Sequence, residues 1–398
     1  MALDIQHIAV MGGAGRVGLP LGLALADAGF RVTLYDIDRR ALDAIASGRL
    51  PFRENGAEPL LRRLLTTDRL EPAADRQSLA PADAVISVIG TPVDEHLNPR
   101  LNHFMEAMES ILHVLRDGQL LVLRSTVSPG TCEHLRHALA AAGRRVHLAF
   151  CPERIAEGRA LDELAKLPQI VSGFSPEAVA GARAIFTRLG PEIIELTPAE
   201  AELSKLFVNV WRYLKFAVAN QFYMIANDLG LDYEPILRSI QYNYPRGADL
   251  PQPGFAAGPC LFKDTMQLAA AAHPGFELGH SAMRINEGLP NYLVRRLAAR
   301  YPLREMTVGI LGMTYKPESD DTRESLSYKL RKILVRHAAA VLCADPYVAD
   351  PTFVGPEELV ERSDLVIVGT PHAAFASLDF RGKPLVDIWG LYGRGRRV

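Results

Sequence analysis

The first part of the chain alternates between short apolar runs and glycine-bearing turns. The run at residues 5–11 (IQHIAVM) is typical of a short buried strand, and residues 19–29 (LPLGLALADAG) are typical of a helix that stops at Gly29. A second apolar run at residues 31–38 ends in acid. Strand, glycine-rich turn, helix and strand in this order predict a βαβ unit with a parallel sheet.

Apolar runs continue to residue 196 and predict further strands of the same sheet, at residues 82–90, 119–125, 145–150, 170–173 and 192–196. From Glu200 to Asn227 the chain contains no Pro or Gly, and this stretch predicts one long helix. The helical pattern continues to residue 300, interrupted by a loop at residues 242–259. A helix of such length usually bridges domains or forms a dimer.

The end of the chain repeats the pattern of its beginning. Strands are predicted at residues 306–313, 339–346, 363–371 and 383–390. Glycine-bearing turns follow a strand at Gly13 and Gly312, acids end a strand at Asp36 and Asp345, and Gly-Thr-Pro occurs at 90–92 and at 369–371. We therefore expect an α/β fold with two Rossmann-like parallel-sheet domains, residues 1–198 and 301–398, joined by a helical middle domain, residues 199–300, with a long central helix.

Composition excludes several classes of protein. Of the 398 residues, 48% are hydrophobic and 23% charged, and the net charge of −2 provides no basic field for nucleic acid. No apolar run approaches the length of a membrane span. The four cysteines form no C-x-x-C pair and are too sparse for a disulfide scaffold, so we expect no metal site and a cytoplasmic protein.

The first glycine-rich turn has the spacing of a dinucleotide-binding fingerprint, Gly-x-Gly-x-x-Gly after a strand and before a helix. Such glycines let backbone N–H groups approach a pyrophosphate at the start of a helix. Asp36 ends the second strand, where a carboxylate binds ribose hydroxyls and repels a 2′-phosphate, which favours NAD over NADP. The turn residues predicted to contact NAD are Gly13, Ala14, Gly15, Arg16, Val17 and Gly18.

Six further segments, taken in order, resemble the nucleotide-sugar 6-dehydrogenases, the UDP-glucose and UDP-N-acetylmannosamine dehydrogenase superfamily. They are GTPVD (90–94), STVSPGT (125–131), PERIAEG (152–158), AELSKLFVN (201–209), GPCLFKD (258–264) and YKPESDDTRES (315–325). The resemblance implies an N-terminal NAD domain, a dimerising central helix and a C-terminal nucleotide-sugar domain. It also implies oxidation of the C6 alcohol of a UDP-hexose or UDP-N-acetylhexosamine to the carboxylate, a four-electron reaction that uses two NAD⁺.

The resemblance has departures that leave the exact sugar and nucleotide open. Residues 285–294 (INEGLPNYLV) resemble the N-acetylhexosamine branch of the superfamily. Pro259 replaces a glycine that usually precedes the nucleophile, and Cys151 stands where asparagine is common. Near the C-terminus, Trp389 stands where the superfamily often has an arginine within Asp-x-Arg-Gly, so one expected contact to an anionic substrate is missing.

Oxidation of an alcohol to an acid needs a group that holds the aldehyde, and a thiol can do so as a hemithioacetal. Cys260 precedes a predicted helix, whose N-terminus would stabilise a thiolate. The alternative is that Cys260 is a small buried side chain, and Cys151 competes for the role. Asp264 would share a helical face with Cys260, and the resemblance implies that it positions a water or a base.

Other residues gain roles from spacing and from the resemblance together. Lys205 and Asn209 lie four apart on the long helix and suit stabilisation of an oxyanion. The resemblance makes Glu153 the base that activates the hydrolytic water, and Thr126 a contact of that water or of the nicotinamide ribose. Solvated or capping side chains are the alternatives for Lys205 and Thr126.

The resemblance also implies binding residues. Those expected to contact NAD, besides the first turn and Asp36, are Thr91, Pro92, Thr126, Glu157, Lys263 and Arg323. Those expected to contact the nucleotide sugar are Glu153, Lys205, Asn209, Arg246, Gly254, Phe255, Tyr315 and Lys316, with Arg246 reaching the site of the partner subunit. For Arg323, a local ion-pair cluster with Asp320 and Asp321 is the alternative.

Two other functions remain open from the sequence: a two-electron β-hydroxyacid dehydrogenase and a non-enzymatic NAD-binding sensor or scaffold. The long helix favours a homodimer or a higher homo-oligomer. Its predicted apolar stripe comprises Leu203, Leu206, Phe207, Val210, Leu214, Ala217, Val218, Phe222 and Ile225, with Trp211, Phe216 and Tyr223 as additional apolar surface. The alternative is that this surface is buried within the helical middle domain.

Overall fold

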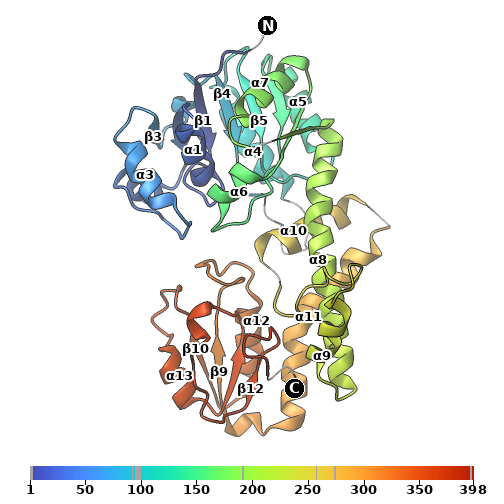
Figure 1. The fold of residues 1–398 in the computed structure, drawn as a ribbon. Coiled ribbons are helices and arrows are strands. Elements are labelled where there is room, and N and C mark those ends of the chain that lie inside the picture. The colour runs from blue at the N-terminus through green and yellow to red at the C-terminus, as the bar shows by residue number, and fades with distance from the viewer. Residues whose placement is uncertain are drawn as a thin grey trace. The chain divides into compact units, whose positions relative to one another are not determined.

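The computed structural model of the protein describes residues 3–91, 93–94, 100–190, 192–256, 258–272, 275–394 and 397–398 (Figure 1). The chain divides into two compact units, Met1–Val208 and Asn209–Val398. Each unit contains one β-sheet flanked by helices, as the alternation of apolar runs predicts. The predicted α/β class with two Rossmann-like domains is therefore confirmed.

The first unit is built on an eight-stranded sheet with the order β3-β2-β1-β4-β5-β6-β7-β8. The strands are β1 (His7–Met11), β2 (Arg31–Tyr35), β3 (Leu70–Ala73), β4 (Ala84–Ser87), β5 (Leu120–Leu123), β6 (His147–Phe150), β7 (Gln169–Gly173) and β8 (Ile193–Glu195). Strands β1 to β6 pair in parallel, whereas β7 pairs antiparallel with β6. The edge strand β3 was not predicted, because its sequence LEPA is short and contains a proline.

Helices cover both faces of this sheet (Figure 1). They are α1 (Gly18–Asp27), α2 (Arg39–Ala46), α3 (Ala57–Leu65), α4 (Leu101–Leu112), α5 (Thr131–Ala141), α6 (Ala160–Lys166) and α7 (Pro176–Phe186), with a 3₁₀ turn at Arg76–Leu79. Alternate residues of β1 point to opposite faces, so Ile8 and Val10 join the core under α1 and α7. Ala9 and Met11 join the core under α4 and α5. The buried strands are thus apolar on both faces, as parallel sheets require.

The second unit carries a four-stranded parallel sheet with the order β10-β9-β11-β12. Its strands are β9 (Thr307–Leu311), β10 (Ala340–Ala344), β11 (Leu365–Val368) and β12 (Leu385–Val386). Its helices are α9 (Tyr233–Gln241), α10 (Pro259–Ala271), α11 (Glu277–Arg300), α12 (Leu326–Leu334) and α13 (Pro356–Arg362), with 3₁₀ turns at Leu303–Glu305 and Ala373–Phe375. One core contains Tyr223, Leu293 and Ile310, so the helical segment and the sheet of this unit share their buried apolar surface. The predicted division into three domains stays a prediction.

The predicted long helix is present as α8 (Pro198–Asp228), which continues through the division between the two units. Leu206, Val210 and Ala217 are buried along it. Tyr223, expected to add surface apolar area, is instead fully buried and meets the ring of Tyr233 edge-on at 6.1 Å. A stripe of apolar side chains remains exposed on α8: Phe207, Trp211, Val218, Phe222 and Ile225. The α8 stripe is defined by these five residues.

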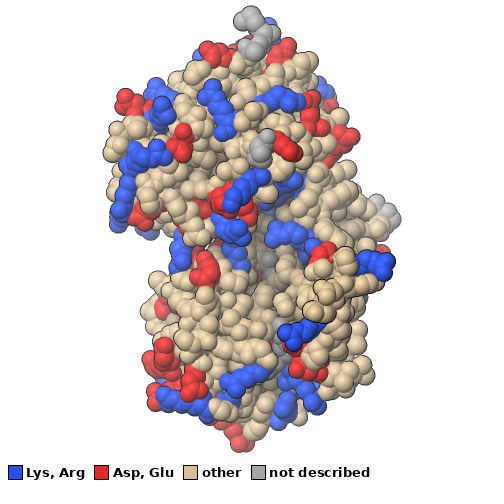
Figure 2. All heavy atoms as spheres, in the orientation of Figure 1, with Lys and Arg blue, Asp and Glu red and all other residues tan. Residues whose placement is uncertain are grey.

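The charged side chains on the visible face of the molecule have no single dominant sign (Figure 2). On the face shown in Figure 2, lysine and arginine side chains are interspersed with aspartate and glutamate side chains on each unit. This distribution agrees with the near-zero net charge of the sequence. Within the described residues, no helix combines the length and apolar character that crossing a bilayer requires.

Candidate functional site

The turn between β1 and α1 has the close packing that a dinucleotide needs. A Cβ atom added at Gly13 would lie 2.8 Å from the Leu34 Cα, and one added at Gly18 would lie 2.0 Å from the Gly12 carbonyl oxygen. Only glycine therefore fits at these two positions, and the backbone is left open to a ligand. α1 follows directly, so the positive end of its helix dipole lies at this turn, where it favours a bound pyrophosphate.

Asp36 faces this turn from the end of β2. One carboxylate oxygen of Asp36 accepts a hydrogen bond of 3.0 Å from the Ala14 N–H, and the other accepts one of 3.0 Å from the Asp38 N–H. The side chain is half-buried, so a carboxylate oriented by two backbone donors remains accessible to the hydroxyls of a ribose. The predicted residues therefore fit NAD.

Two other predicted cofactor residues meet at the ends of β4 and β5. The Thr91 hydroxyl donates a hydrogen bond to the Thr126 carbonyl oxygen. Pro92 lies outside the described residues. Arg16, in the first turn, places its guanidinium over the ring of Phe52, 5.0 Å from the ring centre. Thr91 and Thr126 are thus held together by a hydrogen bond, and Arg16 is held against the ring of Phe52.

Glu153, the expected base, is held by Arg124, a residue for which the sequence predicted no role. The Arg124 guanidinium is fully buried and binds one Glu153 carboxylate oxygen through its Nε, at 3.0 Å, and its Nη2. The other carboxylate oxygen accepts from the N–H groups of Arg154, at 2.7 Å, and Ile155, at 3.1 Å. All four acceptor positions of the carboxylate are thereby used. The signal in the sequence was a charged residue directly after the apolar strand β5.

Two further carboxylates fasten the loop at residues 152–160, which contains Glu153 and Glu157. The buried Glu54 accepts hydrogen bonds of 2.7 Å from the N–H groups of Gly158 and Ala160. Glu163 accepts one of 2.6 Å from the Ala156 N–H. Such backbone contacts fix the loop, so the two predicted acids are presented by a rigid segment.

Cys260 lies in the first turn of α10, one residue inside the helix that it was expected to precede. Gly258 precedes the helix with φ of +90°, and Pro259 occupies the first helical position. Of the four cysteines, all of which lie in the described part of the chain, only Cys260 is exposed. Its position at a helix N-terminus favours the thiolate through the helix dipole.

The other three cysteines are unsuited to act as nucleophiles. Burial raises the pKa of Cys151 to about 12 and that of Cys343 to about 11. Burial and the neighbouring Glu202 carboxylate raise the pKa of Cys132 well above its usual value. The thiolate is the reactive form of cysteine, so the competing assignment to Cys151 is disfavoured by its environment.

Asp264, one turn after Cys260, is the centre of a buried polar cluster. The Asn209 amide donates a hydrogen bond of 2.5 Å to one Asp264 oxygen, and the Lys263 ammonium lies 2.8 Å from the other. The Asp264 side chain is buried, so its carboxylate oxygens need such polar partners. The predicted residues Asn209, Asp264 and Lys263 are therefore brought together. Lys205 is buried one turn before Asn209 on α8.

The predicted sugar-binding loop before α10 is fixed from two sides at Gly254. The buried Asn220 amide accepts from the Gly254 N–H, at 2.8 Å, and donates to its carbonyl oxygen, at 3.1 Å. The Trp389 indole packs against Gly254, where a Cβ atom would lie 2.5 Å from the ring, and its Nε1 donates to the Gly369 carbonyl oxygen at 2.9 Å. Trp389 thus contributes packing where a cationic side chain was expected. Phe255, the next residue, is buried.

The remaining predicted residues lie on loops of the second unit. Tyr315 packs its ring against Gly258, and Lys316 follows it. Arg323 forms an ion pair with Asp321, its Nη2 lying 2.6 Å from a carboxylate oxygen, as the local-cluster alternative describes. Arg246 is exposed and donates from its Nε to the Tyr244 hydroxyl at 2.9 Å. Among the described residues, no group of three or more His, Cys, Asp or Glu is arranged to hold a metal ion.

Comparison with known proteins gives consistent matches along the chain. Residues 6–189, 199–288 and 309–394 match the NAD binding, central and UDP binding domain models of the UDP-glucose/GDP-mannose dehydrogenase family. A UDP-N-acetyl-D-mannosamine dehydrogenase of Pyrococcus horikoshii is 31% identical over 388 residues, which are 94% of this chain and 91% of that protein.

Two solved structures have a similar fold. The structure of a UDP-D-ManNAc dehydrogenase from Pyrococcus horikoshii matches with a TM-score of 0.90 at 28% identity, over 97% of this chain and 96% of that one. A UDP-glucose dehydrogenase from Pyrobaculum islandicum matches with a TM-score of 0.90 at 28% identity, over 99% of this chain and 96% of that one.

Proposed function

The chain belongs to the UDP-glucose/GDP-mannose dehydrogenase family, and we propose that it oxidises the C6 alcohol of a UDP-linked sugar to the carboxylate through a thioester on Cys260. It is an NAD-dependent nucleotide-sugar dehydrogenase. This identity removes the β-hydroxyacid dehydrogenase and the non-enzymatic NAD sensor as alternatives.

The observation that carries the covalent route is the setting of Cys260: exposed, at a helix N-terminus and one turn from the buried Asp264 cluster. Two NAD molecules, bound in turn, would supply the hydride acceptor for the two oxidations. Between the oxidations, the Cys260 sulfur forms a C–S bond to the aldehyde carbon, and the aldehyde oxygen takes the thiol proton to give a hemithioacetal. Loss of the second hydride from this carbon, and of the hydroxyl proton, leaves the thioester. Water then attacks the thioester carbonyl, the C–S bond breaks, its electron pair returns to sulfur, and the carboxylate product leaves.

The polar residues around these steps have separate proposed roles. Lys205 and Asn209 stabilise the oxygen that becomes negative as the alcohol proton and the hydride leave. Asp264 fixes the Asn209 amide by the 2.5 Å hydrogen bond. Glu153 is the proposed base for the hydrolytic water. Because its four acceptor positions are occupied in this structure, one of its backbone or Arg124 contacts must open when it takes the proton.

Product stoichiometry tests the covalent route. Each sugar consumed should yield two NADH and one uronic acid, and Cys260→Ser should lower kcat by orders of magnitude because serine forms a more stable ester. Cys151→Ser is the matched control and should keep its activity. One NADH per sugar with release of an aldehyde, or full activity of Cys260→Ser, would contradict the route.

We propose a UDP-N-acetylhexosamine as the substrate. The segment at residues 285–294 supports this choice, and the relative from Pyrococcus horikoshii is named for such a sugar. Rates of NADH release from UDP-N-acetylmannosamine, UDP-N-acetylgalactosamine and UDP-glucose at equal concentration test it. A higher kcat/KM for UDP-glucose would reverse the assignment.

The absence of paired cysteines supports a cytoplasmic location as a further part of the proposal.

We propose that the α8 stripe pairs with the same stripe of a second copy. Trp211 and Phe222 are 57% and 44% exposed, and an isologous contact between two copies would cover both. Sedimentation at micromolar concentration should give a dimer or larger oligomer, and Trp211→Glu/Phe222→Glu should give a monomer. Leu278→Glu, at an exposed leucine on α11, is the control. A wild-type monomer with full activity would exclude the dimer.

Arg246 is proposed to reach the sugar nucleotide bound to the partner subunit. Its loop is exposed, and its guanidinium is held by Tyr244 rather than by a carboxylate of the described chain. Mixing the inactive Cys260→Ser and Arg246→Ala variants under subunit exchange should restore part of the activity through hybrid sites. No restoration, with exchange demonstrated by mass, would place Arg246 in its own subunit's site.

A further inference from the structure

The loop after β9 is closed around one fully buried imidazole, that of His372. The Glu318 N–H donates to His372 Nδ1 at 3.1 Å, and His372 Nε2 lies 3.1 Å from Asp345 Oδ2 and 3.0 Å from the Thr314 hydroxyl oxygen. A backbone N–H can only donate, so Nδ1 is the acceptor and the proton of the ring is on Nε2. The imidazole therefore joins both ends of residues 314–318.

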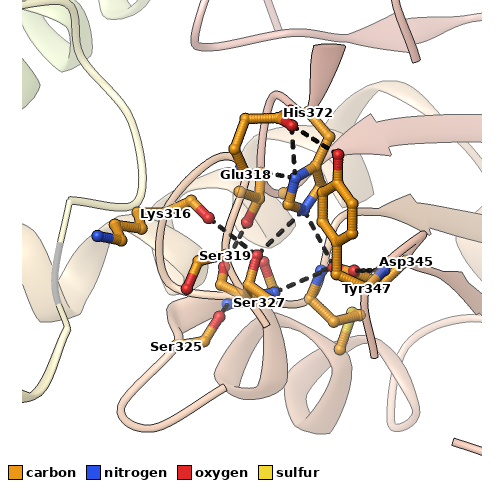
Figure 3. A network of polar contacts seen from close by, with 12 residues as sticks. Lys316, Glu318, Ser319, Ser325, Ser327, Asp345, Tyr347 and His372 are labelled. Atoms are coloured by element: carbon orange, nitrogen blue, oxygen red, sulfur yellow. Dashed lines mark hydrogen bonds and ion pairs between the residues drawn. The ribbon is translucent and has the colours of Figure 1, made fainter. Parts of the chain in front are cut away.

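Glu318 is strained at the point where this loop turns back. Its φ of +56° lies in the left-handed region, which costs energy for a non-glycine residue. Its carboxylate accepts from the Ala373 N–H at 2.8 Å and from the Tyr347 hydroxyl at 2.5 Å. Figure 3 shows Glu318, His372 and Tyr347 directed toward one another. These contacts hold the strained conformation in place.

The loop that is held in this way carries Tyr315 and Lys316. The Thr314 hydroxyl donates to the Lys316 carbonyl oxygen at 3.0 Å, while the Lys316 side chain points away from the network (Figure 3). The Tyr315 ring rests on Gly258, where a Cβ atom would lie 2.4 Å from a ring carbon. Gly258 immediately precedes the helix that carries Cys260. The loop thus connects the UDP-binding domain with the start of the nucleophile's helix.

We propose that His372 is a positioning residue: through Nδ1 and Glu318 it fixes the Tyr315–Lys316 loop for nucleotide binding and for the setting of Cys260. The nucleotide ligand in this inference rests on the proposed function, whereas the contacts made by His372 do not. His372 lies within the matched UDP binding domain, residues 309–394, yet is buried and so cannot touch substrate itself. Its effect must pass through the loop.

Two substitutions separate the two ring nitrogens. In His372→Asn, the amide oxygen can take the place of Nδ1 and accept from Glu318, while the contact to Asp345 is lost. In His372→Gln, the amide nitrogen can take the place of Nε2, while the Glu318 N–H loses its acceptor. We expect the Kd of UDP, measured by calorimetry, to stay within about twofold for the Asn variant and to rise about fivefold or more for the Gln variant. The Kd of NAD should be unchanged in both.

Tyr347→Phe and Tyr392→Phe form a matched pair, since each removes one hydroxyl from this domain. Only the Tyr347 hydroxyl bonds Glu318, whereas the Tyr392 hydroxyl bonds the Phe375 carbonyl oxygen. Tyr347→Phe should weaken UDP binding and Tyr392→Phe should not. This pair also decides the proposal if a His372 variant fails to fold.

Alkylation of Cys260 by iodoacetamide provides a readout that needs no substrate. When the Tyr315 ring is released, Gly258 is uncovered. The rate of Cys260 alkylation should therefore rise in His372→Gln and Tyr347→Phe and stay near the wild-type rate in His372→Asn and Tyr392→Phe. If the wild-type protein does not bind UDP, the nucleotide assignment fails while these rates still decide the role of His372. Equal effects of the Asn and Gln variants, or wild-type UDP affinity and alkylation rate in His372→Gln, would overturn the proposal.

Discussion

Replacing Arg124 by lysine tests whether the buried ion pair fixes the loop that carries Glu153. Lysine keeps the positive charge but lacks the planar fork of arginine. Arg124 also donates to the Cys151 carbonyl oxygen and the Gln169 side-chain oxygen, both at 3.2 Å, and lies 4.5 Å from the centre of the Phe186 ring. A lysine in this site can keep one contact to Glu153 and must give up most of the others.

The expected loss follows from these contacts. Two lost hydrogen bonds contribute about 1 kcal/mol each. A weakened cation–ring contact contributes about 0.5–1 kcal/mol more. The sum of about 2–3 kcal/mol corresponds to a fall in Tm of roughly 4–12 °C for a unit of this size. Arg124→Met would cost about 3–5 kcal/mol, at the lower end because two backbone N–H groups still hold Glu153.

Thermal unfolding followed by circular dichroism measures this loss. The transition that NAD raises belongs to the first unit, since a ligand stabilises the unit to which it binds. Arg145→Lys is the control, because Arg145 pairs with Asp117 at 3.0 Å on the exposed surface and should show no resolvable change. Arg124→Met/Glu153→Leu should recover part of the loss, since both charges are then gone. A Tm for Arg124→Lys within about 1 °C of wild type would refute the reasoning.

Three further outcomes are expected. A chromogenic disulfide reagent should react rapidly with one thiol of the native protein, Cys260, and with four after unfolding; two rapid thiols would contradict the burial of the others. Asp36→Ala should reduce the preference for NAD over NADP by about tenfold in kcat/KM, because repulsion of the 2′-phosphate is lost. Although burial opposes ionisation, hydrogen bonds from His372 and the Met313 N–H hold the pKa of Asp345 below its usual value. A carboxyl with a lowered folded-state pKa stabilises above its unfolded pKa of about 3.9 and loses this effect as the pH falls. Urea unfolding should therefore show Asp345→Asn to be less stable near neutral pH, with a difference that narrows below about pH 4; a difference independent of pH would contradict it.

Local sequence patterns predicted most of the fold. The alternation in β1 places Ile8 and Ala9 on opposite faces, and two buried faces are what a parallel sheet between helices requires. The glycines at positions 13 and 18 indicate a close approach of other backbone atoms, independently of the rest of the sequence. The helical run after Cys260 predicts α10, although the helix begins at Pro259, one residue before Cys260. Each of these features depends on neighbouring residues, which the sequence displays directly.

The positions of charged side chains depended instead on distant partners. Arg124 and Glu153 are 29 residues apart, and Asp345 and His372 are 27 apart, so neither pair shows a helical or strand period. The sequence shows an arginine after an apolar strand but not the carboxylate that the fold brings to it. The same limit applies to Trp389, whose packing against Gly254 no local pattern indicates.

The two sheets place an acid at the same topological position and use it differently. In the first unit, Asp36 accepts from Ala14 and Asp38 and stays half-buried, which leaves the carboxylate accessible to a ribose. In the second, Asp345 accepts from three backbone N–H groups and faces His372, with its side chain fully buried. A carboxylate buried and held in this way is not accessible to a ribose diol. The second sheet therefore cannot hold NAD as the first does, and its acid instead anchors the imidazole that closes the Tyr315–Lys316 loop.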